Sequence, residues 1–334
     1  MAPISARMVM VRALARWLSL VAFLGVLALG ACTSSPPVEL SQPSPQGLAP
    51  SPTLVTPCPT ATPRPQMVVI ISVDGLAAGA FVNASTPYLD SLWQDGAYSW
   101  SAQTVLPSAT LPAHASMVSG LDVPTHGITW NDWLPERGYL RRPTVFTLAK
   151  EAGFKVAAFV GKAKLRHLMP PGAVDHFAMP GYWAKDIVPE AVDYLLRERP
   201  QLLFIHLPDP DTVGHDSGWF SPDQLAAISQ VDQAIGLLLE ALRREGLWDT
   251  TLIIVTSDHG GHDRVHGSDD PRDTTIPWMI HGPGVRKGVE LQGPIRVLDT
   301  APTALWALGI RPPEEWEGRP VREAFAPEPV CARP

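Results

Sequence analysis

Four short, continuously apolar runs constrain this chain more than any other feature of its sequence. They cover residues 67–73, 154–161, 201–207 and 251–257. Short apolar runs without polar alternation are typical of strands buried on both faces of a parallel sheet. Segments with helical spacing lie between them, notably residues 86–97 and the long stretch 221–245. Strands that alternate with helices predict an α/β fold with a mainly parallel sheet and helices on both faces.

Acidic and imidazole side chains follow three of these runs at the point where each run ends. They are Asp74 after the first run, Asp209 and Asp211 after the third, and Asp258 with His259 after the fourth. The carboxyl ends of parallel strands meet at one edge of a sheet, and ligands bind there in open α/β sheets. The sequence therefore predicts that these side chains gather in a single site.

The spacing of acids and histidines near these strand ends is typical of metal ligands. Asp211 and His215 are four residues apart in a predicted loop, and His262 and His266 follow His259 in the segment GGHDRVHGSDD. Mixed carboxylate and imidazole ligands suit zinc well. Taken singly, an acid after a strand is a common turn former, and a lone histidine is commonly packed or solvated. Taken together, these residues predict a metal centre.

The stretch TVLPSATLPAHASMVSG (residues 104–120) places Thr110 where a helix begins. One interpretation is helix capping, because Ser and Thr precede many helices and Pro is favoured in the first turn. The other is a nucleophile, held where the amides at the start of a helix favour an anion. The stretch by itself leaves both interpretations open.

Residues 1–31 have the features of a lipoprotein signal peptide. Three arginines precede an apolar run, Trp17 to Ala31, that is short for a transmembrane helix, and Cys32 follows at once. The run LALGAC resembles a bacterial lipobox. That resemblance implies export and a lipidated Cys32 that anchors the chain to the outer face of a membrane. An ordinary secretory signal or an uncleaved anchor is the alternative.

Residues 32–66 and 67–334 differ sharply in composition. The first segment holds ten prolines and few large apolar residues, which predicts a disordered tether. The second contains all four apolar runs and is expected to form a single domain. Cys58 and Cys331 could pair after export or remain free thiols.

The overall charge argues against a nucleic acid as partner. A formal net charge of -7 gives no reason to expect a nucleic-acid-binding surface. A phosphate-bearing substrate would therefore need local positive charge, and metal ions are one source of it.

The motifs SVDG, PSATLPAHASMVSGL, HGITWN, PDPDTVGH, TSDHGG and RVHGSDD occur in the order found in the alkaline phosphatase superfamily. They most resemble its nucleotide pyrophosphatase/phosphodiesterase (type I phosphodiesterase) branch, and the resemblance extends over residues 67–325. It implies an alkaline-phosphatase-like three-layer sandwich and makes residues 67–334 the catalytic domain.

The resemblance also implies two zinc sites, although other divalent metals such as Mn²⁺ would suit the same ligands. Asp209 is an alternative to Asp211, and His262 is an alternative to His266 or a residue that supports a ligand. Asn131 would donate a hydrogen bond to a phosphate oxygen, together with the amide at the start of the helix. The implied ligands are Asp211, His215 and His266 for one ion, and Asp74, Asp258 and His259, with Thr110 beside them, for the other.

The activity implied is cleavage of a phosphodiester or pyrophosphate bond in a small phosphodiester or nucleotide, through a phosphothreonine on Thr110. Phosphomonoesterases and phosphonoacetate hydrolases of the same superfamily are alternatives. Monoester enzymes usually add a clamp for the third phosphate oxygen, and no sequence pattern shows one here. A non-catalytic, surface-anchored binding protein is a third interpretation. Sulfatase activity is not expected, because sulfatases need Cys or Ser in a CxPxR pattern at the position of Thr110.

Several aromatic residues flank the expected site loops and could stack on a nucleobase or simply pack. They are Trp130, Tyr182, Trp183 and Trp219.

Overall fold

The computed structural model describes residues 64–327. Within that range the chain forms one eight-stranded sheet with the order β4-β3-β5-β1-β6-β7-β2-β8. The expectations for the signal peptide, Cys32, most of the tether, Cys58 and Cys331 lie outside the described residues.

The centre of the sheet is parallel, as the apolar runs predict. Strand β1 pairs in parallel with β5 on one side and with β6 on the other, and β3 pairs in parallel with β5 and β4. The far edge is mixed, because β7 runs antiparallel to both β6 and β2. The strands are β1 (Met67–Val73), β2 (Ala97–Gln103), β3 (Val156–Val160), β4 (His176–Ala178), β5 (Leu202–Leu207), β6 (Thr251–Thr256), β7 (Thr275–His281) and β8 (Val289–Glu290).

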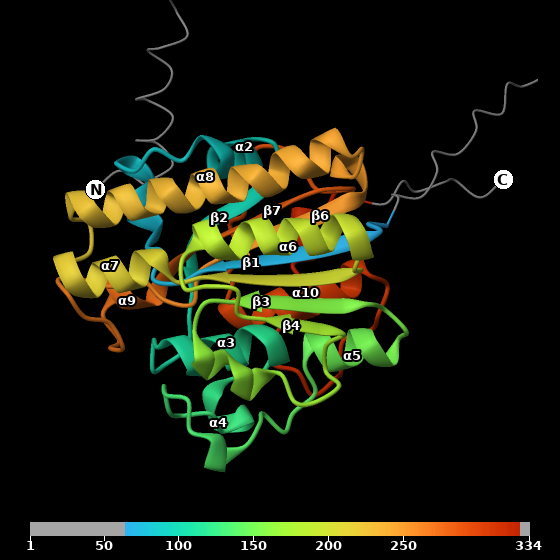
Figure 1. Ribbon diagram of the computed structural model, residues 1–334, viewed down its shortest axis with the longest axis horizontal. Coiled ribbons are helices and arrows are strands. Elements are labelled where there is room, and N and C mark those ends of the chain that lie inside the picture. The colour runs from blue at the N-terminus through green and yellow to red at the C-terminus, as the bar shows by residue number, and fades with distance from the viewer. Residues whose placement is uncertain (1–63, 328–334) are drawn as a thin grey trace, which may run out of the picture.

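Helices cover both faces of the sheet, which confirms the expected three-layer architecture (Figure 1). Alternate side chains of β1 enter opposite cores: Val68 and Ile70 pack in one, and Val69 and Ile71 pack in the other. Helices α3 (Thr110–Ser119), α5 (Val145–Glu151) and α10 (Thr300–Ala307) complete the first core, and α2 (Pro87–Gln94), α6 (Ala184–Glu198) and α8 (Pro222–Arg244) complete the second.

Helix α8 closely matches the stretch expected to be helical, and it begins with a cap. The Ser221 hydroxyl accepts a hydrogen bond from the Gln224 amide, and Pro222 occupies the first turn. Of the helices in the described part of the chain, α8 is the one long and apolar enough to cross a membrane by length and composition. Its apolar side chains pack in the core that α2 and α6 also cover, and that packing accounts for their presence.

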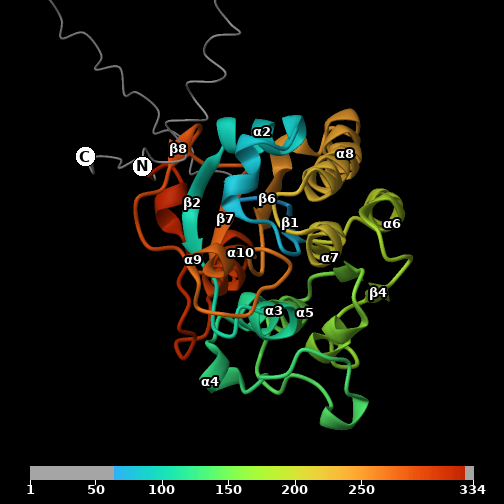
Figure 2. The same cartoon turned by 90° about the vertical axis from the view of Figure 1, so that its left-hand side faces the viewer.

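Three short helices lie at the edges of the layers: α4 (Val123–His126), α7 (Asp209–Ser217) and α9 (Pro271–Thr274). Helices α7 and α9 lie at one end of the sheet, at the left of Figure 1, and face the viewer in Figure 2. The prediction that residues 211–215 form a loop was wrong, because α7 begins directly after the strand β5. Asp211 and His215 are therefore one helical turn apart.

Candidate metal centre and active site

The site forms where β5, β1 and β6 end, and these three strands are neighbours in the sheet. Asp74 directly follows β1, and Asp258 and His259 follow β6. The Asp74 amide donates to the Leu207 carbonyl at 2.9 Å, and the Asp211 amide donates to the Asp74 carbonyl at 3.1 Å. These two backbone hydrogen bonds fix the start of α7 against the end of β1.

Asp211, His215 and His266 converge through their side-chain tips. The Asp211 Oδ1 lies 3.5 Å from the His215 Nε2 and 3.4 Å from the His266 Nε2. The two imidazole Nε2 atoms are 3.1 Å apart. The structure thus brings together the three residues expected to bind one ion, with Asp211 and His215 on one face of α7.

Asp74, Asp258 and His259 form a second group next to the first. The His259 Nε2 lies 3.4 Å from the Asp74 Oδ1 and 3.4 Å from the Asp258 Oδ2. It also lies 3.8 Å from the Asp211 Oδ1, and this contact joins the two groups. All three side chains of the second group are fully buried.

In their neutral forms the three histidines carry a hydrogen on Nδ1 and leave the inner nitrogen, Nε2, without one. In each of them Nδ1 donates to a backbone carbonyl, at 2.9 Å to Arg264 from His215, at 2.8 Å to Gly260 from His259, and at 2.8 Å to Ser108 from His266. Each neutral imidazole then has a lone pair on the Nε2 atom that faces the cluster. The Nε2 atoms of His215 and His266 thus point two lone pairs at each other, an arrangement that a cation between them would stabilise.

Several buried atoms of the cluster have no hydrogen-bond partner. They are the Oδ1 atoms of Asp74 and Asp211, the Oδ2 of Asp258 and the Nε2 of His259. A buried polar atom without a partner costs about 1–3 kcal/mol, so a group of them facing one space needs a ligand there. Since all of them are electron-pair donors of the carboxylate and imidazole type, the residues fit divalent metal ions such as zinc.

Thr110 is the first residue of α3, and the helix capping interpretation was wrong. Ala109 occupies the cap position, and the Thr110 side chain makes no capping hydrogen bond. The Thr110 side chain instead contributes to a cavity of about 550 Å³ that Asp211, His215 and His266 also line. Its hydroxyl is therefore available to a ligand of that cavity.

Asn131 lines the same cavity and is oriented by α3. Its Oδ1 accepts a hydrogen bond from the Leu111 amide at 2.9 Å. The side-chain nitrogen, which can only donate, is thereby left for another partner. The Leu111 amide, in the first turn of α3, is thereby occupied by Asn131.

Lys162 is a part of the site that the sequence analysis missed. It follows β3, and its Nζ lies 2.8 Å from the Asp74 Oδ2, 2.5 Å from the Asp211 Oδ2 and 3.5 Å from the Thr110 Oγ1. Burial alone would raise the pKa of Asp74, but the Lys162 ammonium and the hydrogen bond from His206 hold that pKa well below its usual value. The rule applied to the other strand ends would have identified Lys162, since residues 154–161 form one of the apolar runs.

Two buried histidines support the cluster from behind. The His206 Nδ1 accepts from the Gly161 amide at 3.3 Å, so its Nε2 donates to the Asp74 Oδ2 at 2.8 Å. The His114 Nδ1 donates to the Thr110 carbonyl at 2.7 Å, and its Nε2 accepts from the Ser72 hydroxyl at 2.8 Å. Burial lowers the pKa of His114 to about 4, so this imidazole is neutral near pH 7. The sequence gives no periodic signal for either histidine.

The two alternative ligands lie outside the cluster. The Asp209 carboxylate accepts from the Ala184 amide at 2.9 Å and so holds the start of α6. The His262 Nδ1 donates to the Asp273 Oδ1 at 2.7 Å, and Asp273 also accepts from the Ser268 hydroxyl at 2.7 Å. Both residues therefore fix loops around the site, which favours Asp211 over Asp209 and His266 over His262.

The flanking aromatic residues differ in whether they line the cavity or pack elsewhere. Tyr182 lines the cavity, as does Trp133, which the sequence analysis did not select. Trp219 is buried, donates from its Nε1 to the Gly75 carbonyl at 2.9 Å and packs edge-on against His215. Trp130 packs against His167 with ring centroids 5.5 Å apart. Trp183 lines a separate, smaller pocket.

The profile of one protein family, described as type I phosphodiesterase / nucleotide pyrophosphatase, matches residues 68–269. Among individual relatives, the mouse ectonucleotide pyrophosphatase/phosphodiesterase family member 7 is 26% identical over 61% of this chain and 52% of its own length. An uncharacterised pyrophosphatase/phosphodiesterase of Schizosaccharomyces pombe is 30% identical over 58% of this chain and 44% of its own length. The chain thus spans about half the length of the curated relatives it matches.

The fold also has solved counterparts. The structure of murine ectonucleotide pyrophosphatase/phosphodiesterase 5, an inactive threonine-to-alanine variant in complex with AMP, superposes with a TM-score of 0.68. That match covers 78% of this chain and 100% of the other, at 17% identity. At this identity the likeness shows a shared fold.

Replacing His259 should remove bound metal, because its Nε2 is the atom that joins the two ligand groups. We expect His259→Ala to lower the affinity for zinc by about 100-fold or more, measured by elemental analysis after dialysis against a weak chelator. The matched control is His176→Gln, which changes a histidine stacked on Tyr194 outside the cluster and should keep its metal. Equal metal contents in the two variants would contradict the assignment.

Metal binding should release protons and strengthen as pH rises. Burial lowers the pKa of His259, but Asp258, Asp74 and Asp211 outweigh that effect and raise it to about 9. Below that pH an ion must displace a proton from His259, so zinc affinity should increase roughly tenfold per pH unit between pH 6.5 and 8.5 and then level off. Titration calorimetry in two buffers of different ionisation enthalpy measures the released protons. An affinity independent of pH would contradict this prediction.

Proposed function

Because this chain belongs to the type I phosphodiesterase / nucleotide pyrophosphatase family, we propose that it is a two-metal hydrolase that cleaves phosphodiester or pyrophosphate bonds with Thr110 as the nucleophile. One observation carries the proposal: the inward lone pairs of three histidines and the unpartnered oxygens of three carboxylates face one space beside the cavity that Thr110 lines. A non-catalytic binding protein would have no need to keep such a costly arrangement intact.

Asp211, His215 and His266 would hold one ion, and Asp74, Asp258 and His259 the other. The bound ions supply Lewis acid catalysis: they polarise the phosphoryl group and make a hydroxyl or a water easier to deprotonate. Zinc suits these ligands best, and Mn²⁺ is compatible with them.

The chain's own residues position the reacting atoms. The Thr110 oxygen attacks phosphorus after losing its proton to solvent, a new P–O bond forms, and the bond to the leaving alcohol or phosphate breaks. The product of this step is a phosphothreonine. Water then attacks the same phosphorus, the bond to Thr110 breaks, and the threonine hydroxyl is restored. The side-chain nitrogen of Asn131 donates to a non-bridging oxygen while negative charge accumulates there.

A nucleotide or similar small phosphodiester fits the cavity as substrate. A volume of about 550 Å³ lies within the usual range for small-molecule sites. Tyr182 and Trp133 line the wall and offer ring faces or edges for a base. The related murine enzyme with this fold has been solved in complex with AMP, which supports the same class of ligand here.

Removing the Thr110 hydroxyl should abolish turnover and leave the metal in place. We expect Thr110→Ala to lower kcat for bis-p-nitrophenyl phosphate by about 10⁴-fold or more. Mass spectrometry of acid-quenched enzyme should show a phosphorylated peptide containing Thr110 in the unsubstituted chain alone. Thr125→Ala is the control, because Thr125 is exposed on α4 and should keep full activity. Turnover by Thr110→Ala near the control rate would refute the nucleophile.

We also propose that the chain is exported and anchored to the outer face of a membrane through lipidated Cys32, with residues 33–66 as a tether. The arginine-rich start, the short apolar run and the LALGAC sequence support this. The full chain expressed in a bacterium should incorporate labelled palmitate, and Cys32→Ala should not. Equal labelling of the two would refute the lipid anchor.

A further inference from the structure

Resting on the function proposed above, we propose that Lys162 and Lys164 form an anion-binding pair that selects substrates with a second negative charge next to the scissile P–O bond. Such a charge lies on the same phosphorus in a phosphomonoester and on the neighbouring phosphorus in a pyrophosphate. The pair would make these substrates preferred over simple diesters, which carry one charge.

Lys162 is positioned to contact the phosphoryl group that Thr110 attacks. Its Nζ lies 3.5 Å from the Thr110 Oγ1, and its side chain is only 10% exposed. The preceding residue, Gly161, packs closely against Pro208, since a Cβ at position 161 would lie 2.6 Å from the Pro208 ring. This packing fixes the backbone that carries Lys162. The ammonium is therefore held at the end of β3, within reach of any oxygen bound beside Thr110.

Lys164 lies farther along the same wall. It belongs to the short 3₁₀ helix η4 (Ala163–Leu168) and lines the cavity together with Lys162, Thr110 and Tyr182. Within residues 64–327, Lys162 forms ion pairs with Asp74 and Asp211, whereas Lys164 forms none. A partly buried ammonium that faces a cavity without a carboxylate partner is suited to an anionic ligand.

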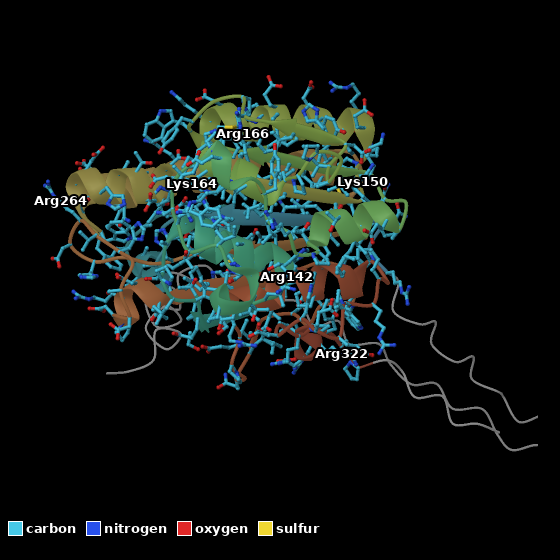
Figure 3. The ribbon with its side chains drawn as sticks, turned by 90° about the horizontal axis from the view of Figure 1, so that it is seen from below. Arg142, Lys150, Lys164, Arg166, Arg264 and Arg322 are labelled. Carbon is cyan, nitrogen blue, oxygen red and sulfur yellow. The ribbon has the colours of Figure 1, made fainter. Side chains whose placement is uncertain are left out.

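A further positive side chain, that of Arg166, is exposed on η4. Arg166 lies two residues beyond Lys164, and both are labelled on the same side of the molecule in Figure 3. The Arg166 guanidinium lies 6.0 Å from the centre of the Trp133 ring and lines a neighbouring pocket, which shares Trp133 with the cavity. Since the whole chain has a formal charge of -7, this positive region is local and cannot result from the overall composition.

The balance of charge in the cavity favours a substrate with more than one negative charge. Asp74, Asp211 and Asp258 contribute three negative charges, and the two lysines contribute two positive charges. With two divalent ions bound, the site carries an excess of three positive charges. An ionised Thr110 reduces that excess to two, which a pyrophosphate diester or a monoester dianion neutralises and a simple diester does not.

Lys162 could also serve only to neutralise Asp74 and Asp211 within the fold. That role would affect ligands of every charge equally, whereas an anion-binding role depends on ligand charge. Comparing matched ligands that differ in charge alone therefore separates the two roles.

The test measures binding of three adenine nucleotides to the zinc-loaded full chain by calorimetry, with Thr110→Ala present in every variant so that no ligand is hydrolysed. AMP methyl ester carries one phosphate charge, AMP carries a second on the same phosphorus, and ADP carries further charge on the next one. With both lysines present, the protein should bind AMP about tenfold more tightly than its methyl ester, which corresponds to one charge-assisted hydrogen bond. Lys162→Gln should abolish most of that preference, and Lys162→Arg should retain it.

Lys164→Gln should weaken ADP binding by about tenfold and change binding of the methyl ester by less than about threefold. Lys287→Gln is the matched control, because Lys287 is exposed outside the cavity, and it should bind all three ligands normally. Metal content and unfolding temperature, measured for each variant, show whether site and fold are intact. Equal weakening of all three ligands, or no weakening, in both lysine variants would overturn the proposal.

Turnover separates this proposal from the function on which it rests. Failure of the unsubstituted protein to hydrolyse either diadenosine pyrophosphate or adenylyl-adenosine would refute the proposed function, while the charge preference is read from binding alone. If both are hydrolysed, kcat/KM should favour the pyrophosphate, and Lys164→Gln should reduce this ratio. An unchanged ratio would overturn the lysine assignment and leave the hydrolase intact.

Discussion

The structure depends on the burial of three carboxylates, Asp74, Asp211 and Asp258, each of which has an oxygen 3.4–3.8 Å from the His259 Nε2. Two like charges about 4–5 Å apart repel by roughly 3–4 kcal/mol at an effective dielectric of 20, and burial adds a further cost for each carboxylate. No arrangement of backbone amides alone offsets such a concentration of charge. The site is therefore built to contain cations, and the surrounding residues follow from that requirement.

The protein satisfies part of this requirement itself. Lys162 pairs with Asp74 and Asp211, and the Nε2–H of His206 donates to Asp74. The charge of Asp258 is less well compensated. One of its oxygens accepts from the Gly75 and His259 amides, and the other has no hydrogen-bond partner. Burial and the neighbouring Asp74 raise the pKa of Asp258. The carboxylate that the chain satisfies least is thus in the group centred on His259, where an ion would bring the largest gain in stability.

Much of the site could be predicted from sequence because it follows from topology. Parallel strands deliver their carboxyl ends to one edge, so an acid directly after an apolar run is placed there whatever the loops do. The same logic fails for residues inside strands: His206 lies within β5 and His114 within α3, and both look like ordinary core positions in the sequence. The prediction also failed at residues 211–215, which were expected to form a loop and belong to the helix α7.

The site combines two kinds of scaffold with different tolerance to change. Of the proposed metal ligands, Asp74, Asp258 and His259 follow the central strands β1 and β6 within three residues, so the most rigid part of the fold sets their geometry. Asp211 and His215 lie on α7, and His266 lies in the loop after β6. Asn131, Trp133, Lys164 and Tyr182 come from loops and a short 3₁₀ helix that line the open side of the cavity. Changes in those segments would alter which phosphate compound binds without displacing an ion. The cluster of proposed metal ligands can therefore stay constant while the substrate changes, and selectivity should be sought in the segment that follows β3 rather than within that cluster.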